Sequence, residues 1–378
     1  MLNAKIEYIL HLYSIVRGFA MHTQSEEVIS VVVDDGHFNL KGVMLGDKGE
    51  IARFVKPSLI MSGHSNAVST ISADKYSKDF ETIDKDGNPT YFTAMDRLPF
   101  GQNSMLVDTQ NQKFQLSEAN RVLVHAMLHH MGLEGKKVHL ITTSPMQRYF
   151  RSSGEIDSRY IDERNANLMV PVTTKDGKQV EIVQCEQVPE GFATYLSMLL
   201  KYNQDSKKIS IDGELIHKDI LILDFGGQTL DVAVISGNSL LTDKSFTEEG
   251  VGMLKIYDHM YDYLKSYRQN ISRVEMSDII ETGQFYTDKK QTNLISVVDE
   301  VEKAIRNVLT AGLDKVSKRV PFNNFDKVVV TGGSAIVLAK YLKVIIDETE
   351  HASDPLFSNA IGALINHIRE KRMAVVTA

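Results

Sequence analysis

The sequence predicts an α/β protein with two domains, and three observations support this. The chain has 378 residues, which exceeds a typical domain of roughly 100 to 200 residues. Short β-branched runs are separated by longer segments with helical spacing, as in proteins that pack helices against sheets. Hydrophobic residues make up 43% of the chain and charged residues 24%, which is typical of a globular protein with a large core.

The predicted strands are continuous apolar runs, a pattern typical of strands that are buried on both faces. They occupy residues 28–33, 138–142, 180–183, 220–223, 232–235 and 327–330. Two hairpin turns are also predicted, at Asp86-Gly87 and Asp176-Gly177, because an Asp-Gly pair favours a tight connection between antiparallel strands.

The predicted helices are longer segments in which apolar residues recur every three or four positions. They are residues 117–131, 191–202, 252–267, 294–318, 335–346 and 355–372. Residues 1–20 have the same spacing, and three interpretations remain open for them: a docking helix, a product of an upstream start codon, and a membrane-surface or partner helix. Residues 56–114 lack a long periodic helix and are rich in polar residues, so we expect an inserted subdomain there, while residues 203–219 form a polar link.

Charge and cysteine content exclude several classes of protein. With 42 basic and 49 acidic residues the net charge is −7, which argues against direct binding to nucleic-acid phosphates, so any link to DNA needs an adaptor. The single cysteine, Cys185, excludes a disulfide framework and fits a cytoplasmic protein. Charges interrupt the apolar stretches well before the roughly 18 to 20 residues of a spanning helix, so no transmembrane segment is expected.

Two predicted strands end in an aspartate that is followed by glycine. The first turn is Asp34-Asp35-Gly36 and the second is Asp224-Phe225-Gly226-Gly227. Glycine lets backbone N–H groups approach phosphate oxygens, and an aspartate at a strand tip can hold Mg²⁺ through water. Two such turns can hold the phosphates of a nucleotide from both sides.

Three further elements extend this pattern. Lys41 follows the first turn on a returning strand and can reach a phosphate as a point charge. Gln228 and Thr229 follow the second turn with side-chain polar groups. Residues 331–335, TGGSA, follow a strand and open a helix, where a nucleotide's sugar or α-phosphate can pack against bare backbone.

The order and spacing of DDG at 34, DFGGQT at 224 and TGGSA at 331 resemble the phosphate-1, phosphate-2 and adenosine motifs of the actin-like ATPase superfamily. Four segments are similar to the plasmid-segregation actins, the ParM or StbA family. They are VVVDDGHFNLKG, YIDERNANLMVPV after TTSPMQRYF, CEQVPEGFATYL and LILDFGGQTLDVAVISG. The resemblance spans residues 28 to about 370 and implies an actin-like fold, in which two α/β domains enclose a nucleotide cleft.

The resemblance also implies a division of the chain. We expect an N-terminal arm at residues 1–27, domain I at 28–190 plus 355–378 with the insertion at about 56–114, and domain II at 191–354.

By the same resemblance, Glu186 positions or activates the attacking water, although a surface carboxylate at a helix start is the alternative. Asp35 and Asp224 are expected to act in catalysis by holding Mg²⁺ through water, with Asp34 as their partner or support. The implied nucleotide contacts are Asp34, Gly36, Asn39, Lys41, Gly226, Gly227, Gln228, Thr229, Glu249, Gly250, Gly332, Gly333 and Ser334. His37, Phe38 and Gln228 depart from the family, which commonly has hydroxyl residues there.

Other candidate sites are weaker. Cys185 has no accompanying histidine motif, so a buried structural thiol is expected. His125 and His129 lie one helical turn apart without an evident third ligand, so an ordinary helix face is expected rather than a metal site.

The resemblance implies a cytoplasmic ATPase, using ATP or GTP with Mg²⁺, that polymerises into filaments and hydrolyses the nucleotide. In the family, a DNA-bound adaptor captures the filament and plasmid copies are pushed apart. Two alternatives are a small-molecule kinase and a non-polymerising scaffold ATPase of the same superfamily.

Overall fold

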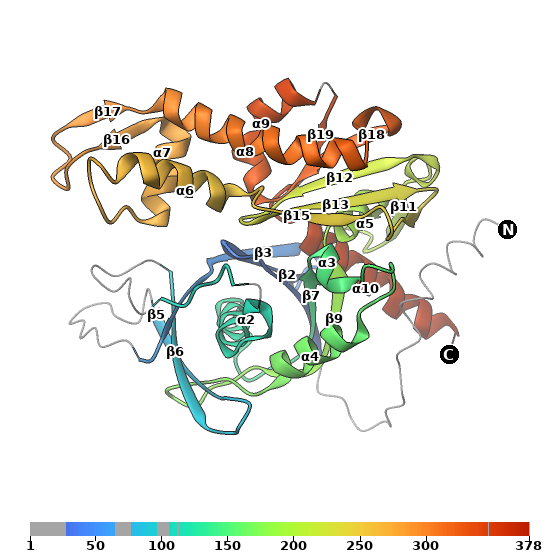
Figure 1. Cartoon of the computed structure of the whole chain (residues 1–378). Coiled ribbons are helices and arrows are strands. Elements are labelled where there is room, and N and C mark those ends of the chain that lie inside the picture. The colour runs from blue at the N-terminus through green and yellow to red at the C-terminus, as the bar shows by residue number, and fades with distance from the viewer. Residues whose placement is uncertain (1–27, 65–76, 97–105, 112, 347, 378) are drawn as a thin grey trace.

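The computed structural model describes residues 28–64, 77–96, 106–111, 113–346 and 348–377. Two lobes, each built around a sheet, lie one above the other in Figure 1. The expected N-terminal helix at residues 1–20 lies outside the described residues.

The sheet of the first lobe has the order β3-β2-β1-β7-β9. Its strands are β1 (Ile29–Asp35), β2 (Asn39–Leu45), β3 (Ile51–Pro57), β7 (Lys137–Ser144) and β9 (Glu181–Pro189). β1, β2 and β3 form an antiparallel meander, whereas β7 and β9 run parallel to β1. The carboxyl ends of β1, β7 and β9 therefore meet at one edge of the sheet.

Helices α2 (Glu118–His130) and α4 (Ser158–Met169) pack on one face of this sheet. Both begin with a capped turn, because Ser117 accepts a hydrogen bond from the backbone of Asn120 and Asp157 accepts one from that of Tyr160. Every second residue of β1 points to this face, and the core there is almost entirely aliphatic and aromatic.

The segment predicted as an insertion contributes three strands of a small sheet with the order β4-β6-β5-β8. They are β4 (Leu59–Ser62), β5 (Ser77–Ile83) and β6 (Pro89–Met95), and β8 (Thr173–Thr174) joins from later in the chain. The predicted hairpin at Asp86-Gly87 is confirmed: it connects β5 to β6, with Gly87 at φ +83°.

The second lobe contains a sheet with the order β14-β13-β12-β18-β19, to which β15 adds beside β13. The strands are β12 (Ile220–Phe225), β13 (Thr229–Ser236), β14 (Ser239–Leu240), β15 (Phe246–Glu249), β18 (Lys327–Thr331) and β19 (Glu350–His351). β12 and β13 are antiparallel, and β18 is parallel to β12. This lobe thus repeats the strand-turn-strand arrangement of β1 and β2.

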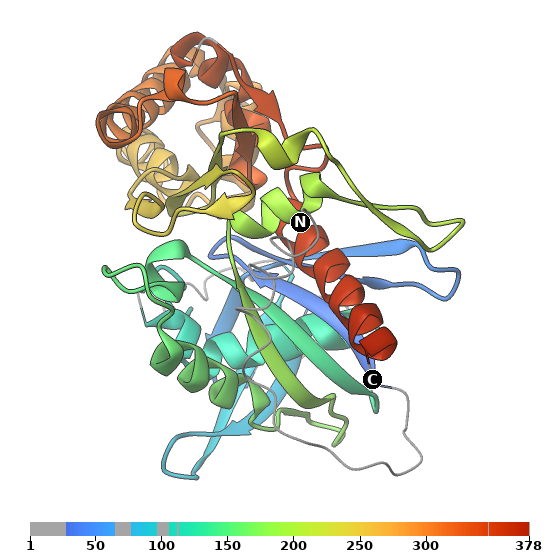
Figure 2. The same ribbon diagram turned by 90° about the vertical axis from the view of Figure 1, so that its right-hand side faces the viewer.

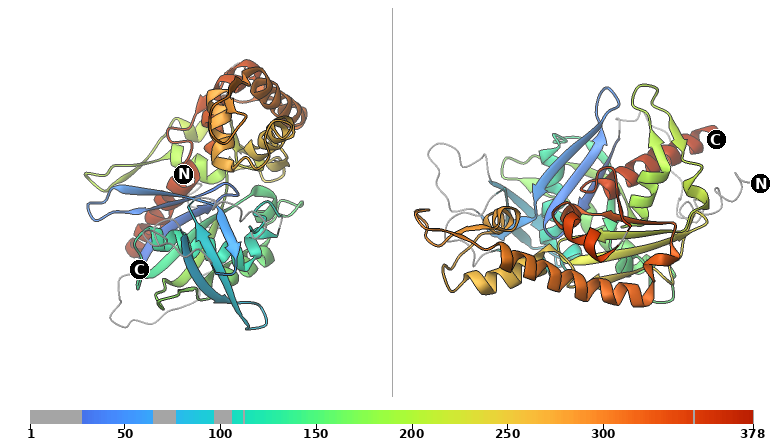
Figure 3. Two further views of the ribbon diagram at one scale, coloured as in Figure 1. Left: turned by 90° about the vertical axis from the view of Figure 1, so that its left-hand side faces the viewer. Right: turned by 90° about the horizontal axis from the view of Figure 1, so that it is seen from above.

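Four helices share one core with the second sheet, on the side opposite α10 (Figure 3). They are α6 (Met253–Leu264), α7 (Arg273–Thr282), α8 (Val298–Arg319) and α9 (Gly333–Ile345). The helix predicted from residue 294 begins four residues later, because β17 (Leu294–Ser296) pairs with β16 (Gln284–Tyr286).

Helices α5 (Phe192–Leu199) and α10 (Ser358–Thr377) lie between the two sheets and share one core with both. Figure 2 shows α10 running from the junction of the lobes along the first sheet. The two helices cross closely at Gly362, where a Cβ atom would collide with the carbonyl oxygen of Ala193. The helix predicted over residues 191–202 ends at Leu199, because β10 (Leu200–Tyr202) pairs with β11 (Ile209–Ile211).

The remaining elements are α3 (Met146–Tyr149) and the 3₁₀ turns Phe114–Leu116, Leu215–His217 and Phe322–Asn324. Within the described part of the chain, every helix is too short or too polar to cross a membrane. The architecture is α/β, as the sequence predicts.

Candidate functional site

A cavity of about 280 Å³ lies between the lobes, where the turns after β1 and β12 face each other. The residues that the sequence predicts as nucleotide or Mg²⁺ contacts and that line this cavity come from three segments of the chain. They are Asp34, Asp35, Gly36, Asn39, Lys41, Asp224, Gly226, Gly227, Thr229, Gly332, Gly333 and Ser334. The three motifs, far apart in sequence, therefore meet at one place.

In the first turn, the two adjacent aspartates have different surroundings. Asp34 accepts hydrogen bonds from Lys41 Nζ at 3.1 Å and from Thr143 Oγ1 at 3.0 Å. Asp35 forms a buried ion pair with Arg164 and accepts a hydrogen bond from Asn120 Nδ2 at 2.7 Å. The side chain of Asp35 is 1% exposed and its charge is paired with Arg164, whereas that of Asp34 is 6% exposed and is bonded to Lys41 at the cavity. Asp34 is therefore the less enclosed of the two carboxylates.

Lys41 reaches Asp34 because the two residues are directly opposite each other in the β1–β2 pair. Burial alone would lower the pKa of Lys41, but the carboxylate of Asp34 outweighs this effect and raises it. Lys41 is therefore a fixed positive charge at the base of the cavity.

In the second turn, Asp224 faces the cavity and pairs across the strands with Asp231. Asn359, in the first turn of α10, donates a hydrogen bond to Asp224 Oδ2 at 2.5 Å. Burial, together with the charges of Asp231 and Asp34, raises the pKa of Asp224 to about 7. An oxygen-rich group of carboxylates that repel one another fits Mg²⁺, because a divalent cation removes this repulsion.

A further acidic residue, Glu190, lines the cavity from the turn between β9 and α5. Burial and the charges of Asp231, Asp34 and Asp224 raise its pKa well above its ordinary value. Gly191, which follows it, has φ +71°, and a Cβ there would lie 2.8 Å from Cβ of Ala233. The turn that presents Glu190 therefore requires a glycine.

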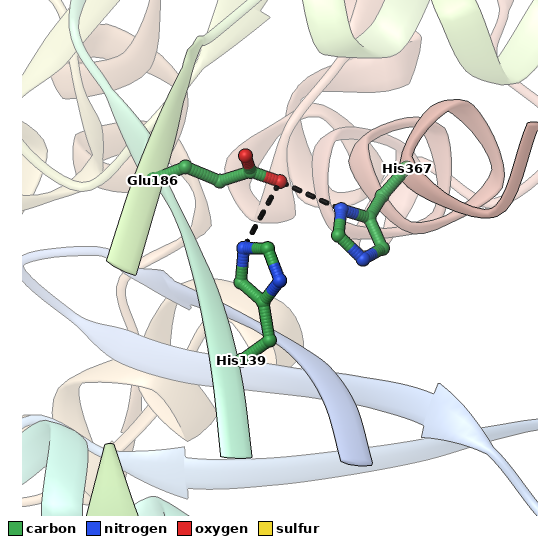
Figure 4. Close-up of side chains that lie close together, drawn as sticks. All are labelled: His139, Glu186 and His367. Carbon is green, nitrogen blue, oxygen red and sulfur yellow. Dashed lines mark hydrogen bonds and ion pairs between the residues drawn. The ribbon is translucent and has the colours of Figure 1, made fainter. Parts of the chain in front are cut away.

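The structure does not place Glu186 among the residues that line this cavity, although the sequence predicts a catalytic role for it. Glu186 lies within β9, opposite Ile141, and its side chain points toward α10. There it contacts His139 and His367, as Figure 4 shows. The sequence carries a signal for Glu190, the Pro-Glu-Gly turn in the same motif, but sequence reasoning chose the acid before this turn.

The third motif closes the cavity beside the second turn. Gly332 has φ +92°, and a Cβ there would collide with Asp224 Oδ1 and the carbonyl oxygen of Phe225. Ser334 Oγ donates a hydrogen bond to the carbonyl oxygen of Gly226 at 2.8 Å. Glycine is thus required at 332 both by the backbone conformation and by the close approach of two loops.

The amino end of α6 rests on the second turn, where Leu254 N donates to the carbonyl oxygen of Gly227 at 2.7 Å. Tyr257, one turn further on, lines the cavity and meets the ring of Phe38 edge-on at 5.7 Å between centroids. Phe38 lies in the first lobe, so this contact bridges the lobes.

Three predicted contacts lie outside the residues that line the cavity: Gln228, Glu249 and Gly250. They hold the β13–β15 connection instead. The carbonyl oxygen of Gln228 accepts a hydrogen bond from Gly250 N at 3.1 Å, and Glu249 accepts one from Gln147 at 3.1 Å. Their expected contact with the nucleotide stays a prediction.

Sequence reasoning missed the apolar side of the cavity, to which α6, α9 and the segment before α10 contribute. Its lining includes Met253, Tyr257, Ile336, Val337 and Leu356. These positions belong to ordinary helical patterns, and no short motif distinguishes them from core residues. With carboxylates and a lysine at one end and apolar groups at the other, the cavity suits a ligand that has both a phosphate chain and a ring.

Comparison with known protein families gives two matches. Residues 29–200 match the family model described as plasmid segregation protein ParM, N-terminal, and residues 216–359 match the one described as plasmid segregation protein ParM, C-terminal. A sequence search of curated proteins found no match.

Solved structures with the same fold include ParM in a 15-stranded filament from Clostridium botulinum, at a TM-score of 0.66 and 19% identity, covering 92% of this chain and 100% of that one. ParM from Bacillus thuringiensis with AMPPNP has a TM-score of 0.61 and 17% identity, with 92% and 100% covered. An archaeal actin homologue in complex with ADP has a TM-score of 0.65 and 16% identity, with 90% and 100% covered. The two family matches and this actin-like fold agree, and the chain belongs to the ParM family of plasmid segregation proteins.

Proposed function

We propose that this protein is a nucleotide-dependent, filament-forming ATPase that segregates plasmid DNA through a DNA-bound adaptor. The observation that carries the proposal is the meeting of two aspartate-tipped turns, one from each lobe, across a single cavity that also holds Lys41. When a ligand contacts both turns, a chemical change in the ligand, such as hydrolysis, can change the relative position of the lobes.

The triphosphate would lie between the two turns. Lys41 would contact the β- and γ-phosphates, and the backbone N–H groups of Gly226 and Gly227 would donate to phosphate oxygens. The nucleoside would pack against Gly332 and the apolar side that includes Tyr257. The relatives described with AMPPNP and with ADP support an adenine nucleotide.

Mg²⁺ would be held by Asp34 and Asp224, directly or through water, because these carboxylates face the cavity from opposite lobes. The ion would neutralise charge on the phosphates when bound. Asp35 would act indirectly, by anchoring Arg164 beneath the first turn.

Glu190 would position and activate the attacking water. It lines the cavity, and burial together with the neighbouring carboxylates raises its pKa, which makes it a stronger proton acceptor. Asp35 and Glu186 do not suit this role, since one is held by Arg164 and the other points to the opposite side of β9.

Polymerisation would follow from closure of the lobes. The γ-phosphate favours the closed arrangement by contacting both turns, and hydrolysis removes this bias, so the filament becomes unstable. The filament formed by the similar ParM from Clostridium botulinum supports self-association. The net charge of −7 supports a connection to DNA through an adaptor rather than by direct contact.

The test is sedimentation and light scattering over a range of protein concentrations in Mg·ATP, Mg·GTP, a non-hydrolysable analogue and ADP, with phosphate release measured in parallel. We expect a low critical concentration with triphosphate and a high one with diphosphate. Turnover without assembly in any nucleotide would contradict the filament, and assembly that ignores the nucleotide would contradict the coupling.

A matched pair of variants tests the site itself. Lys41→Met removes the charge in the cavity and should weaken triphosphate binding about 10- to 100-fold, as expected for the loss of a hydrogen bond to a charged group. Lys201→Met changes an exposed lysine of β10 and should bind as the wild type does. Equal affinity in the two variants would show that Lys41 does not contact the phosphates.

A further inference from the structure

A second group of ligating side chains lies outside the nucleotide cavity, on the face of the first sheet that α10 covers. It consists of His139 on β7, Glu186 on β9 and His367 on α10 (Figure 4). One ligand atom from each residue lies within 4.8 Å of the other two. Among the residues that the structure describes, this is the group of histidine and acidic side chains with the spacing of a metal site.

The sheet and helix geometry bring these three residues together. Glu186 pairs with Ile141 in the parallel β7–β9 ladder, so both side chains point to the same face, and His139 lies two residues before Ile141 on that face. A register shift between Val138 and His139 fixes this alignment. Helix α10 crosses above β7 and supplies His367.

Both imidazoles are directed at the same carboxylate oxygen. His367 Nδ1 lies 2.7 Å from Glu186 Oε1, and His139 Nε2 lies 3.5 Å from it. With metal–nitrogen distances of about 2.0 to 2.1 Å, ligand atoms of a tetrahedral site are roughly 3.3 Å apart. The 3.5 Å separation of His139 from Glu186 is close to this value, whereas His367 Nδ1 would have to move roughly 0.6 Å away from Glu186 Oε1 for both to coordinate one ion.

The hydrogen-bond partners of the two histidine rings also fit a metal site. The other ring nitrogen of His367, Nε2, lies 3.1 Å from Ser30 Oγ, and this contact orients the ring with Nδ1 toward Glu186. His139 Nε2 is buried and makes no hydrogen bond within the described structure, because its 3.5 Å separation from Glu186 is too long for a good one. A buried polar atom without a hydrogen bond requires an explanation, and a bound ion supplies one.

We propose that His139, Glu186 and His367 bind one divalent transition-metal ion of the zinc class. The side chain of Glu186 is 30% exposed, so a water molecule can reach the fourth position. Two nitrogen ligands select against Mg²⁺, which prefers an all-oxygen octahedral site, and favour Zn²⁺ or its neighbours in the transition series.

The ion would join α10 to two strands of the first lobe. Asn359, eight residues before His367 and about 12 Å along the helix, donates to Asp224 in the nucleotide cavity. The site thus holds the far part of a helix whose first turn contacts the second lobe. Lys371 donates a hydrogen bond to Ser30 Oγ at 2.8 Å, and its positive charge would repel the bound ion.

The experiment uses the full chain without an affinity tag, stripped of metal by a chelator. Zn²⁺ is titrated against a competing chromophoric chelator, and Co²⁺ serves as a spectroscopic probe of tetrahedral coordination. We expect about one ion per chain, a rise in melting temperature on binding, and no competition from excess Mg²⁺. The variants are His139→Gln, Glu186→Gln and His367→Gln, each of which should weaken Zn²⁺ binding at least 10- to 100-fold.

The matched control is His129→Gln. His129 is also a buried histidine beside a glutamate, Glu134, but among the residues with a described position no third ligand joins this pair. It should bind Zn²⁺ as the wild type does. Circular dichroism of each metal-free variant checks that it is folded. A wild type that binds no ion, or ligand variants that bind as tightly as His129→Gln, would overturn the proposal and leave the three residues as a hydrogen-bonded triad.

Discussion

Glu186 and Glu190 are four residues apart in the chain, yet they lie in opposite electrostatic environments. Glu190 faces Asp34, Asp224 and Asp231, which raise its pKa together with burial. Glu186 faces two histidines that hold its pKa low despite burial. One carboxyl is thereby suited to take up a proton, and the other is suited to remain charged and hold a cation.

The position of each glutamate relative to the end of β9 explains the difference. Glu186 lies within the strand, so the alternation of side chains directs it to the face that α10 covers. Glu190 follows the last strand residue, Pro189, and therefore lies at the carboxyl edge of the sheet. Ligands of open α/β sheets bind at this edge, where the loops after parallel strands meet.

The adjacent aspartates of the first turn repeat this contrast, and their substitution has the largest expected effect. Asp35→Ala leaves the buried guanidinium of Arg164 without its carboxylate, which should lower the free energy of unfolding by about 3 to 5 kcal/mol. Asp34→Ala should cost much less stability, because Lys41 is closer to solvent, but should weaken Mg²⁺-dependent nucleotide binding. Urea denaturation and nucleotide titration of both variants give the comparison.

Equal stability losses in the two variants would contradict the division between a structural and a cavity-facing aspartate. Asp35→Asn is a useful control, since it keeps the shape and loses only the charge.

The next effect concerns the two glutamates directly. Glu190→Gln should bind nucleotide and slow phosphate release by about 10²- to 10³-fold, because a group that acts on the attacking water is lost. Glu186→Gln, compared in buffer free of transition-metal ions, should retain far more activity than Glu190→Gln. Single-turnover phosphate release with saturating Mg·ATP measures both.

The reverse order of activity would indicate that Glu186, rather than Glu190, acts on the attacking water. Glu181→Gln, an exposed position earlier on β9, controls for any general effect of removing a carboxylate from this strand.

The smallest expected effect is on stability: at pH 7, Glu186→Gln and Glu190→Gln should change the free energy of unfolding in opposite directions. The folded-state pKa of Glu186 is depressed, so it stabilises the fold above its unfolded pKa, and this contribution is lost as the pH falls through the folded value. The folded-state pKa of Glu190 is raised, so its ionisation at neutral pH opposes folding. Glu186→Gln should therefore destabilise the metal-free protein and Glu190→Gln should stabilise it, each by about 1 kcal/mol.

Urea denaturation in metal- and nucleotide-free buffer at pH 7 and at pH 5 tests these signs. The gain from Glu190→Gln should shrink toward pH 5, because the wild-type carboxyl, with its raised folded-state pKa, becomes protonated in the folded protein before it does in the unfolded chain. If the free energy of unfolding changed in the same direction in both variants at pH 7, the proposed electrostatic difference between the two glutamates would be wrong.

Much of the fold could be predicted, because its signals are local. The apolar runs that become β1, β7, β12, β13 and β18 predict strands, and the periodic segments predict α2, α6, α8 and α10. Boundaries failed where pairing with a neighbour overrode the pattern, as at residues 200–202 and 294–296. In both places, pairing with another strand determined where the helix ended or began.

The phosphate-binding turns could be predicted for the same reason. An aspartate at a strand tip, a glycine with the conformational freedom to approach an anion, and a lysine on the return strand are all contained within a few residues. The sequence by itself therefore determined the fold class, the three loops that meet at the cavity, and the ParM resemblance that the family matches confirm.

The tertiary structure decided which side chains face which cavity. The choice between Asp34 and Asp35 depends on Arg164, which is more than a hundred residues away, and the choice between Glu186 and Glu190 depends on where β9 ends. His139 and His367 are brought together with Glu186 by a parallel strand pair and a helix from the end of the chain. Side-chain direction depends on strand register and helix placement, and these follow from packing of the whole core rather than from any local run of residues.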